Sequence, residues 1–370
     1  MTQAVPVSAE APPAATPPEL EATPRRGGRL RALLRFGPLV ALVVAAVLPY
    51  FRLPLPGILD GAFNSAGNLQ LLATCLVFGG LAASYDLLFG RTGLLSFGHA
   101  LYFAAGIYGT DVLVTKAGLP LWQAAVFALV GSTTLAALLG AIALRTAGIA
   151  FAMVTLAFAQ VGAILVARDF GGLTGGEEGL PIGGAGLPDF LVGVANTVNL
   201  YWLALAYVTV VVFVVARVAG SPTGRVLAGL RDDERRVGVL GLDPYRYKLV
   251  AFILAGGLAA LGGIVYVLVV GGASPHVTSS ELTLSLLVMV VLGGPGTRWG
   301  PVIGGILYMY LDNRLTNLAT DLPGPLSQPL FVLGAIFILA VYFFPGGLAS
   351  LTIRIAPIRA ALTRRNAKVN

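Results

Sequence analysis

The chain has 370 residues, of which 56% are hydrophobic and 11% are charged, and its formal net charge is +7. Soluble domains carry about 25% charged residues, so in water this chain would expose more apolar surface than one core can bury. One cysteine, Cys75, and two histidines exclude an intrachain disulfide and a multi-histidine metal site. The sequence contains no G-x-x-x-x-G-K-[ST] phosphate loop, so any ATP that drives this protein is hydrolysed on another chain.

The N-terminal residues 1–24 are rich in alanine and proline, a composition typical of a disordered tail. Five arginines follow, and then the apolar run 36–51, which predicts a retained first helix rather than a cleaved signal peptide. We therefore divide the chain into a disordered tail with a basic flank (1–35), a transmembrane domain (36–348) with a cytoplasmic loop at 219–248, and a basic tail (349–370).

Further apolar stretches follow this first helix, and most are long enough to cross a membrane, which takes about 20 residues. Two of them, 282–292 and 299–311, are short and flank a glycine-rich turn, so they are either two short spans or one re-entrant hairpin. The predicted fold is all-α: a polytopic membrane protein with about ten transmembrane segments, some of them short or broken. The stretches after 36–51 lie near 69–88, 93–115, 121–144, 148–167, 199–218, 249–270, 282–292, 299–311 and 328–345.

The lysines and arginines orient these segments. With both termini in the cytoplasm, 20 of the 24 basic residues lie on the inside, as the positive-inside rule requires. The four on the outside are Arg52, Lys116, Arg168 and Arg314. The basic charge therefore reflects membrane topology, and no nucleic-acid partner is expected.

The cytoplasmic loop predicts an amphipathic helix over 224–240, started by Ser221-Pro222 and stopped by Gly241. Its predicted apolar face consists of Val226, Leu230, Val237 and Leu240. One interpretation is a connector helix that rests on lipid head groups. The acidic run 232–234 favours the other, a helix that docks onto a cytoplasmic protein partner, because lipid-binding helices are dominated by basic residues.

Two glycine-interrupted segments, 85–100 and 291–305, lie in the two halves of the chain. In transporters such paired interruptions indicate a pathway near the membrane midplane, built from broken helices. The alternative is that the glycines permit close helix packing and that the histidine is structural. The predicted pathway residues are Ser96, Gly98, His99, Gly293, Gly294 and Gly296.

Three acidic residues, Asp86, Asp111 and Glu281, lie near predicted span ends, where we expect water to reach them. They do not form the acidic relay within the membrane that an ion-coupled secondary carrier would use. Catalytic polar clusters are not visible either, so no catalytic residue is predicted.

Seven motifs, in order over residues 69–350, resemble those of LivM-type permeases, the membrane subunits of branched-chain amino-acid ABC importers. The chain departs from the family pattern at Asp86, where many relatives have Asn, at Arg91, where Tyr is common, at Arg235-Arg236, and at Pro295. The motifs are Gly93–Ala100, Phe151–Gln160, Thr174-Gly175-Gly176 with Gly179-Leu180, Leu230–Gly241, Tyr247–Phe252, Met289–Gly294 with Trp299–Pro301, and Phe344–Leu348.

The resemblance implies a non-enzymatic transport subunit of the bacterial inner membrane that imports branched-chain or related amino acids. It implies a homologous permease, two ATPase subunits that carry the ATP and Mg, and an extracytoplasmic binding protein as partners, and no cofactor on this chain. Permeases for urea, amides or aromatic acids look much the same and stay open. The resemblance places the ATPase-coupling residues at Leu230, Arg231, Asp232, Asp233, Glu234 and Gly241, and the residues facing the binding protein at Thr174, Gly175 and Gly176.

Overall fold

The computed structural model describes residues 42–50, 64–169, 171–183, 186–191, 193, 196–319, 328–343 and 346–349. The predicted tails, 1–35 and 349–370, lie outside these residues except for residue 349, and of the predicted first helix only 42–50 is described. The chain divides into two units, Met1–Val44 and Ala45–Asn370, and the elements below belong to the second.

The described residues are almost entirely helical, which confirms the all-α prediction. Two strands of two residues each, β1 (Leu180–Pro181) and β2 (Gly272–Ala273), pair antiparallel. The short helices outside the bundle are 3₁₀ turns, among them η2 (Gly176–Glu178) and η6 (Pro275–Thr278). The α-helices are α2 (Ala66–Thr92), α3 (His99–Thr115), α4 (Leu121–Ala143), α5 (Ile149–Ala167), α6 (Thr197–Gly220), α7 (Pro222–Asp232), α8 (Glu234–Val239), α9 (Pro244–Val270), α10 (Ser280–Gly293), α11 (Gly300–Ala319) and α12 (Pro329–Phe343).

Helix ends follow local sequence signals. The side chains of Ser221, Asp243 and Ser279 accept backbone N–H groups at the starts of α7, α9 and α10, which are positions where serine and aspartate are favoured. Gly93 and Gly271 end α2 and α9 in the left-handed conformation that glycine adopts without a Cβ clash. Most observed bounds lie close to the predicted ones, and the clearest differences are that α3 begins at His99 rather than near residue 93 and that α11 ends at Ala319 rather than near residue 311.

Among the described residues, five helices are long and apolar enough to cross a membrane: α2, α4, α5, α6 and α9. The other helices that correspond to predicted membrane segments are shorter or less apolar. Helix α10, for example, has 14 residues. A helix of that length rises about 21 Å, less than the roughly 30 Å of a hydrocarbon core. The segment predicted at 282–292 is thus the short helix α10, whereas the segment predicted to end at 311 continues to Ala319 as α11, a helix of 20 residues.

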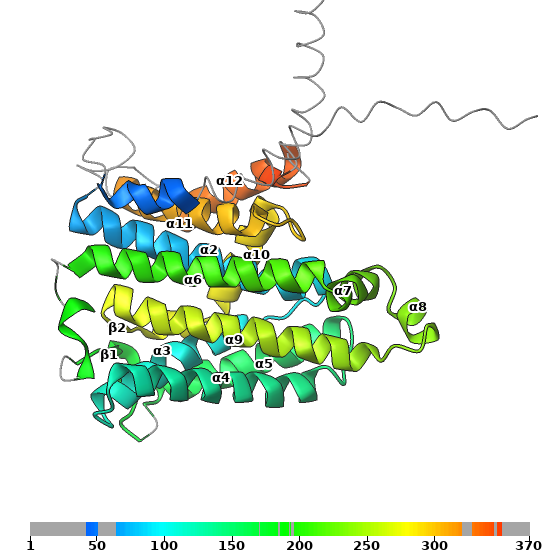
Figure 1. Ribbon diagram of the computed structural model, residues 1–370, viewed down its shortest axis with the longest axis horizontal. Helices are drawn as coiled ribbons and strands as arrows, with labels where there is room; N and C mark the ends of the chain where they lie inside the picture. The colour runs from blue at the N-terminus through cyan, green and yellow to red at the C-terminus, as the bar shows by residue number, and fades with distance from the viewer. Residues whose placement is uncertain are drawn as a thin grey trace, which may run out of the picture. The chain divides into compact units, whose positions relative to one another are not determined.

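Helix α2 lies at the centre of the bundle and contacts α6, α9, α10 and α11. Figure 1 shows α2, α6, α9 and α4 side by side, with β1 and β2 at one end and α7 and α8 at the other. In its most apolar window 78% of α2 is buried, against 22% for α4 and α5. A helix that is apolar all round is buried, whereas the exposed apolar faces of α4 and α5 suit lipid.

Helices α3 and α9 approach to backbone contact through glycines. A Cβ built on Gly106 would overlap the carbonyl oxygen of Ala260, and one on Gly263 would overlap that of Phe103. The small residues within 255–263 therefore serve close helix packing.

Replacing Gly106 by alanine is expected to force α3 and α9 apart and to lower the free energy of unfolding by about 1–3 kcal/mol. Thermal unfolding in detergent measures this change. The matched control is Gly131→Ala on α4, where an added Cβ meets no atom within 4 Å. The control should be neutral or slightly more stable, because alanine favours helix by about 0.5–1 kcal/mol. Equal melting temperatures for the two variants would contradict the packing argument.

Candidate functional site

Between α2 and α3 the chain is not helical and runs back along α2. After Gly93 the segment 94–98 runs back along the last two turns of α2, where the Tyr85 hydroxyl donates to the carbonyl oxygen of Ser96 at 3.0 Å. The imidazole of His99, the first residue of α3, lies 2.9 Å from the Ser84 hydroxyl, two turns before the end of α2. The first pathway segment is thus a break in the helical structure inside the bundle.

Hydroxyl side chains satisfy the backbone of this break. The N–H of Phe97 donates to Thr155 of α5 at 3.0 Å, and the N–H of Ala100 donates to Thr283 of α10 at 3.2 Å. The N–H of Gly98 donates to the Ser96 hydroxyl at 3.3 Å. In a membrane interior, backbone groups outside helices need such partners because no water is available. These side chains are almost fully buried, so the break is closed to solvent.

The hydrogen bonds also assign the protonation of His99. The Ser84 hydroxyl donates its hydrogen to the carbonyl oxygen of Leu81 at 2.7 Å. It must therefore accept from Nε2 of His99, which places the ring hydrogen on Nε2 and leaves Nδ1 as a bare acceptor. Nδ1 is buried and has no hydrogen-bond partner among the described residues. A buried polar atom without a partner is rare in folded proteins.

The second predicted pathway segment, the turn between α10 and α11, contacts the end of α2 instead. Gly294 and Gly296 have φ of 109° and 75°, which favours glycine at both positions. The N–H of Gly296 donates to Oδ1 of Asp86 at 2.7 Å. The Arg91 guanidinium lies 3.5 Å from Oδ2 of Asp86 and donates to the carbonyl oxygen of Thr297 at 3.3 Å.

The structure therefore divides the predicted pathway residues into two groups. Ser96, Gly98 and His99 gather at the α2–α3 break, and Gly296 lies beside the cytoplasmic segment. The expectation that water reaches Asp86 and Asp111 is wrong, because their exposed fractions are 1% and 0%. Each is held by hydrogen bonds: Asp86 to Gly296, and Asp111 to the Thr115 hydroxyl and the Ala273 N–H.

The loop 219–248, predicted to be cytoplasmic, contains two helices, α7 and α8, which corrects the prediction of one helix over 224–240. Asp233 leaves the helical conformation (φ −160°, ψ 105°), and its carboxylate accepts the N–H groups of Arg235 and Arg236 at the start of α8. The acid that follows Asp233, Glu234, pairs with Lys248 of α9 at 2.6 Å. The predicted turn at Gly241 has the expected left-handed φ of 79°.

The apolar residues of the two helices have different roles. In α7, Leu227 and Leu230 are buried against the bundle, and Arg231 donates to the carbonyl oxygen of Gly90 at the end of α2. At the end of α8, by contrast, Val239 and Leu240 are 88% and 77% exposed. The predicted apolar face is therefore wrong at Leu240, which lies just past the last residue of α8, whereas Val237 within α8 is buried as predicted.

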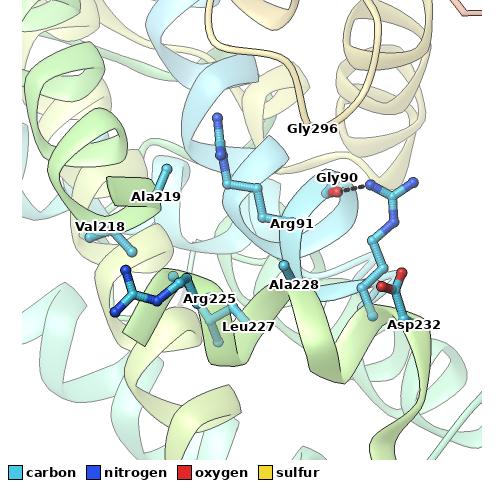
Figure 2. A pocket seen from close by; sticks show the side chains of 11 residues that line it. Gly90, Arg91, Val218, Ala219, Arg225, Leu227, Ala228, Asp232 and Gly296 are labelled. Carbon is cyan, nitrogen blue, oxygen red and sulfur yellow. Dashed lines mark hydrogen bonds between the residues drawn. The ribbon is translucent and has the colours of Figure 1, made fainter. Parts of the chain in front are cut away.

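A cavity of about 260 Å³ lies next to the Arg231 contact. In Figure 2 a dashed line marks the hydrogen bond at Gly90, which Arg231 donates, and the side chains of Arg91 and Arg225 extend in different directions. The cavity is bounded by the ends of α2 and α6, by α7 and by Gly296. The structure thus brings a predicted pathway residue and a predicted coupling residue together here.

The outer-loop residues are organised by Asp169, which the sequence did not indicate. Its carboxylate accepts the N–H groups of Thr174 and Gly175 at 2.7 and 3.0 Å, and the Thr174 hydroxyl at 3.1 Å. These hydrogen bonds, that of the Thr174 N–H first, hold the pKa of Asp169 below its ordinary value. Gly176 is buried, whereas the neighbouring Glu177 and Glu178 are exposed.

A family model described as "branched-chain amino acid transport system / permease component" matches residues 68–341. The chain belongs to this family. It is therefore a permease component, which confirms the prediction of a transport subunit rather than an enzyme. No solved structure matches the chain.

Individual relatives agree with the family. The chain is 27% identical over 310 residues to the high-affinity branched-chain amino acid permease LivM of Salmonella typhimurium, covering 78% of this chain and 71% of the relative. It is 27% identical over 336 residues to LivM of Escherichia coli K12, covering 85% and 75%. It is 31% identical over 180 residues to the autoinducer 2 import permease LsrC of Salmonella typhi, covering 47% and 50%.

Replacing Thr283 by valine keeps the shape of the side chain but leaves the N–H of Ala100 without its acceptor. An unsatisfied buried group costs about 1–3 kcal/mol, and we expect the free energy of unfolding to fall by that amount in detergent. Thr134→Val is the control, because the Thr134 hydroxyl bonds only the carbonyl of Val130 in its own helix. If both variants unfold alike, Thr283 does not stabilise the break.

Proposed function

We propose that this chain forms one half of the pore of an ATP-driven importer for branched-chain or related amino acids in a bacterial inner membrane. Its partners would be a homologous permease, two cytoplasmic ATPase subunits and an extracytoplasmic binding protein. The observation that carries the proposal is the family match over residues 68–341. Branched-chain amino acids are favoured as cargo because the LivM relatives align with 78% and 85% of the chain, against 47% for LsrC.

The proposed topology has about ten membrane segments and both termini in the cytoplasm. Support comes from the ends of the bundle. Arg91 at the end of α2 donates to Thr297 in the α10–α11 turn, and Arg231 of α7 donates to Gly90 at the end of α2. Tyr245 at the start of α9 donates to the carbonyl oxygen of Ala141 near the end of α4. The basic segments therefore meet at one end, as the positive-inside rule requires of a cytoplasmic face.

The proposed translocation path runs beside the α2–α3 break. Broken helices with satisfied backbone groups are the usual walls of a substrate path at membrane depth. The buried, unpartnered Nδ1 of His99 supports this position, because it is a hydrogen-bond acceptor held ready inside the bundle. We assign the described arrangement, with Ser96 and His99 fully buried, to a closed state of the path.

The proposed ATPase-docking element is α8 rather than the whole segment 224–240. Val239 and Leu240 form an exposed apolar tip beside Arg235 and Arg236, and exposed apolar residues framed by polar ones are typical of protein interfaces. The predicted coupling residues would then support this tip. Leu230 and Arg231 seat α7, Asp233 starts α8, and Glu234 ties α8 to α9.

An ion-coupled secondary carrier is the rival from another class. Buried acidic residues, which such a carrier needs, are present as Asp86 and Asp111. Their carboxylates, however, are engaged by backbone N–H groups near the ends of the bundle, where they serve as structural acceptors. This difference favours the ATP-driven importer.

Uptake by proteoliposomes tests the choice between the two classes. With the candidate ATPase, permease and binding-protein partners present, uptake of radiolabelled leucine is expected to require ATP and all the partners. A nonhydrolysable ATP analogue should abolish it. Uptake by this chain alone that follows a proton or sodium gradient would instead establish a secondary carrier.

Replacing Leu240 by aspartate is expected to weaken ATPase docking, because it places a charge in the apolar tip. Loss of a central apolar anchor costs an interface about 2 kcal/mol or more, so co-purification of the ATPase should fall at least about tenfold. Phe190→Asp serves as the control, since Phe190 is an exposed apolar residue in the outer loop. An undiminished ATPase yield with Leu240→Asp would remove α8 as the docking element.

A further inference from the structure

Three separate parts of the chain meet at Gly90, near the end of α2. Its carbonyl oxygen accepts a hydrogen bond from Arg231 of α7. A Cβ at this position would overlap Oδ1 of Asp86 and the backbone nitrogen of Gly296. The backbone of α2 therefore approaches the backbone of the α10–α11 turn at Gly90, and α7 reaches the same residue through the Arg231 side chain. We call this contact the Gly90 junction.

Asp86 and Arg91 hold the α10–α11 turn within the junction. Asp86 accepts the N–H of Gly296 through Oδ1, and its Oδ2 faces the Arg91 guanidinium. Arg91 in turn donates to the carbonyl oxygen of Thr297. The N–H of Gly296 and the carbonyl of Thr297, two neighbouring residues of the turn, are thus bonded to a charge pair on α2. The carboxylate of this pair is 1% exposed. Charge-assisted hydrogen bonds in such a site are stronger than neutral ones.

Arg231 links α7 to the same point. Besides its bond to Gly90, its guanidinium lies 3.0 Å from the position that a Cβ of Gly296 would occupy, so it touches the turn as well as α2. Leu227 and Leu230 of the same helix are buried against the bundle, and Arg231 directly follows Leu230. A shift of α7 therefore moves the Arg231 guanidinium against the turn.

Helix α10 connects the junction with the α2–α3 break. It ends at Gly293, directly before the turn, and near its other end Thr283 accepts the N–H of Ala100 at the start of α3. The ten steps along the helix from Thr283 to Gly293 rise about 15 Å. Backbone contact between Gly304 and Met289 packs α11 tightly onto α10, so the two helices form one stiff pair.

We propose that Asp86, Arg91 and Arg231 are positioning residues that fasten the α10–α11 turn to α2 and α7, so that a displacement of α7 is transmitted along α10 to the α2–α3 break. The inference rests on the proposed function, since it requires a cytoplasmic ATPase that moves α7 and α8. Charge strengthens the fastening, because the turn bonds Asp86 and Arg91 through backbone groups, the Gly296 N–H and the Thr297 carbonyl.

The test uses the complete transporter in proteoliposomes and measures leucine imported per ATP hydrolysed. Asp86→Leu removes the acceptor of the Gly296 N–H and the charge partner of Arg91, and Arg231→Ala removes the link from α7. Each should lower the ratio at least about fivefold, the lower end of typical coupling between sites, while ATP hydrolysis continues. Arg231→Lys, which keeps a donor for the Gly90 carbonyl, should restore part of the loss.

The matched control is Arg246→Ala. Arg246 is a largely exposed arginine in the cytoplasmic part of α9 that pairs only with Asp243 among the described residues, and exposed pairs contribute little. Its import per ATP should equal that of the unaltered complex. The double variant Asp86→Leu/Arg231→Ala should be no worse than the more severe single variant, because both changes cut one connection.

Normal import per ATP in Arg231→Ala, or a double variant whose loss equals the product of the two single losses, would overturn the inference. If Asp86→Leu does not assemble, the Arg231→Ala and Arg231→Lys pair decides the outcome by itself. If the unaltered complex shows no ATP-dependent import, the proposed function fails rather than the junction. ATP-dependent import with unchanged ratios in all variants rejects the junction alone.

Discussion

The constraint on which this structure depends is that every backbone group inside a membrane must find a hydrogen-bond partner within the protein. Helices meet it by themselves, and the chain interrupts them only where side chains can replace the lost bonds. At the α2–α3 break those side chains come from three helices: Tyr85 from α2, Thr155 from α5 and Thr283 from α10. The break is thereby tied to helices that the sequence places far apart.

Helix α2 has a special position because three consecutive residues take part in different contacts. Ser84 and Tyr85 bind the α2–α3 break, and Asp86 binds the α10–α11 turn. Successive residues of a helix point about 100° apart, so one turn can serve several neighbours at once. This explains why α2 is buried on all sides and why polar residues occur in an otherwise apolar helix.

The segment that contains α7 and α8 divides two tasks between these two helices. Helix α7 buries leucines and binds the end of α2, whereas α8 projects an apolar tip that has no partner within the described part of the chain. The bend at Asp233 creates this division, since its carboxylate caps α8 while its own N–H still bonds the carbonyl of Gly229. A firmly seated base and an exposed tip are what a helix needs if it is to pass a partner's movement into the membrane.

The sequence by itself determined the membrane class, the helical fold and most helix bounds. Apolar run length and caps such as Ser221, Asp243 and Gly93 are local properties, and the ordered motifs indicated the permease family. The same local signals identified His99 and Gly296 as unusual residues. They did not show that these residues belong to different contacts.

Only the tertiary structure decided which side chains serve the breaks. Thr155 is a single hydroxyl in an apolar run and Thr283 is one of several hydroxyls near the start of α10, and no pattern along the chain says which hydroxyl meets a free N–H. The sequence predicts that Asp86 lies near a span end that water reaches. Its neighbours across the bundle bury it instead, and one of them supplies the N–H of Gly296. Periodicity reports which face of a helix is apolar, whereas hydrogen-bond partners depend on how distant helices pack, and that information is not local.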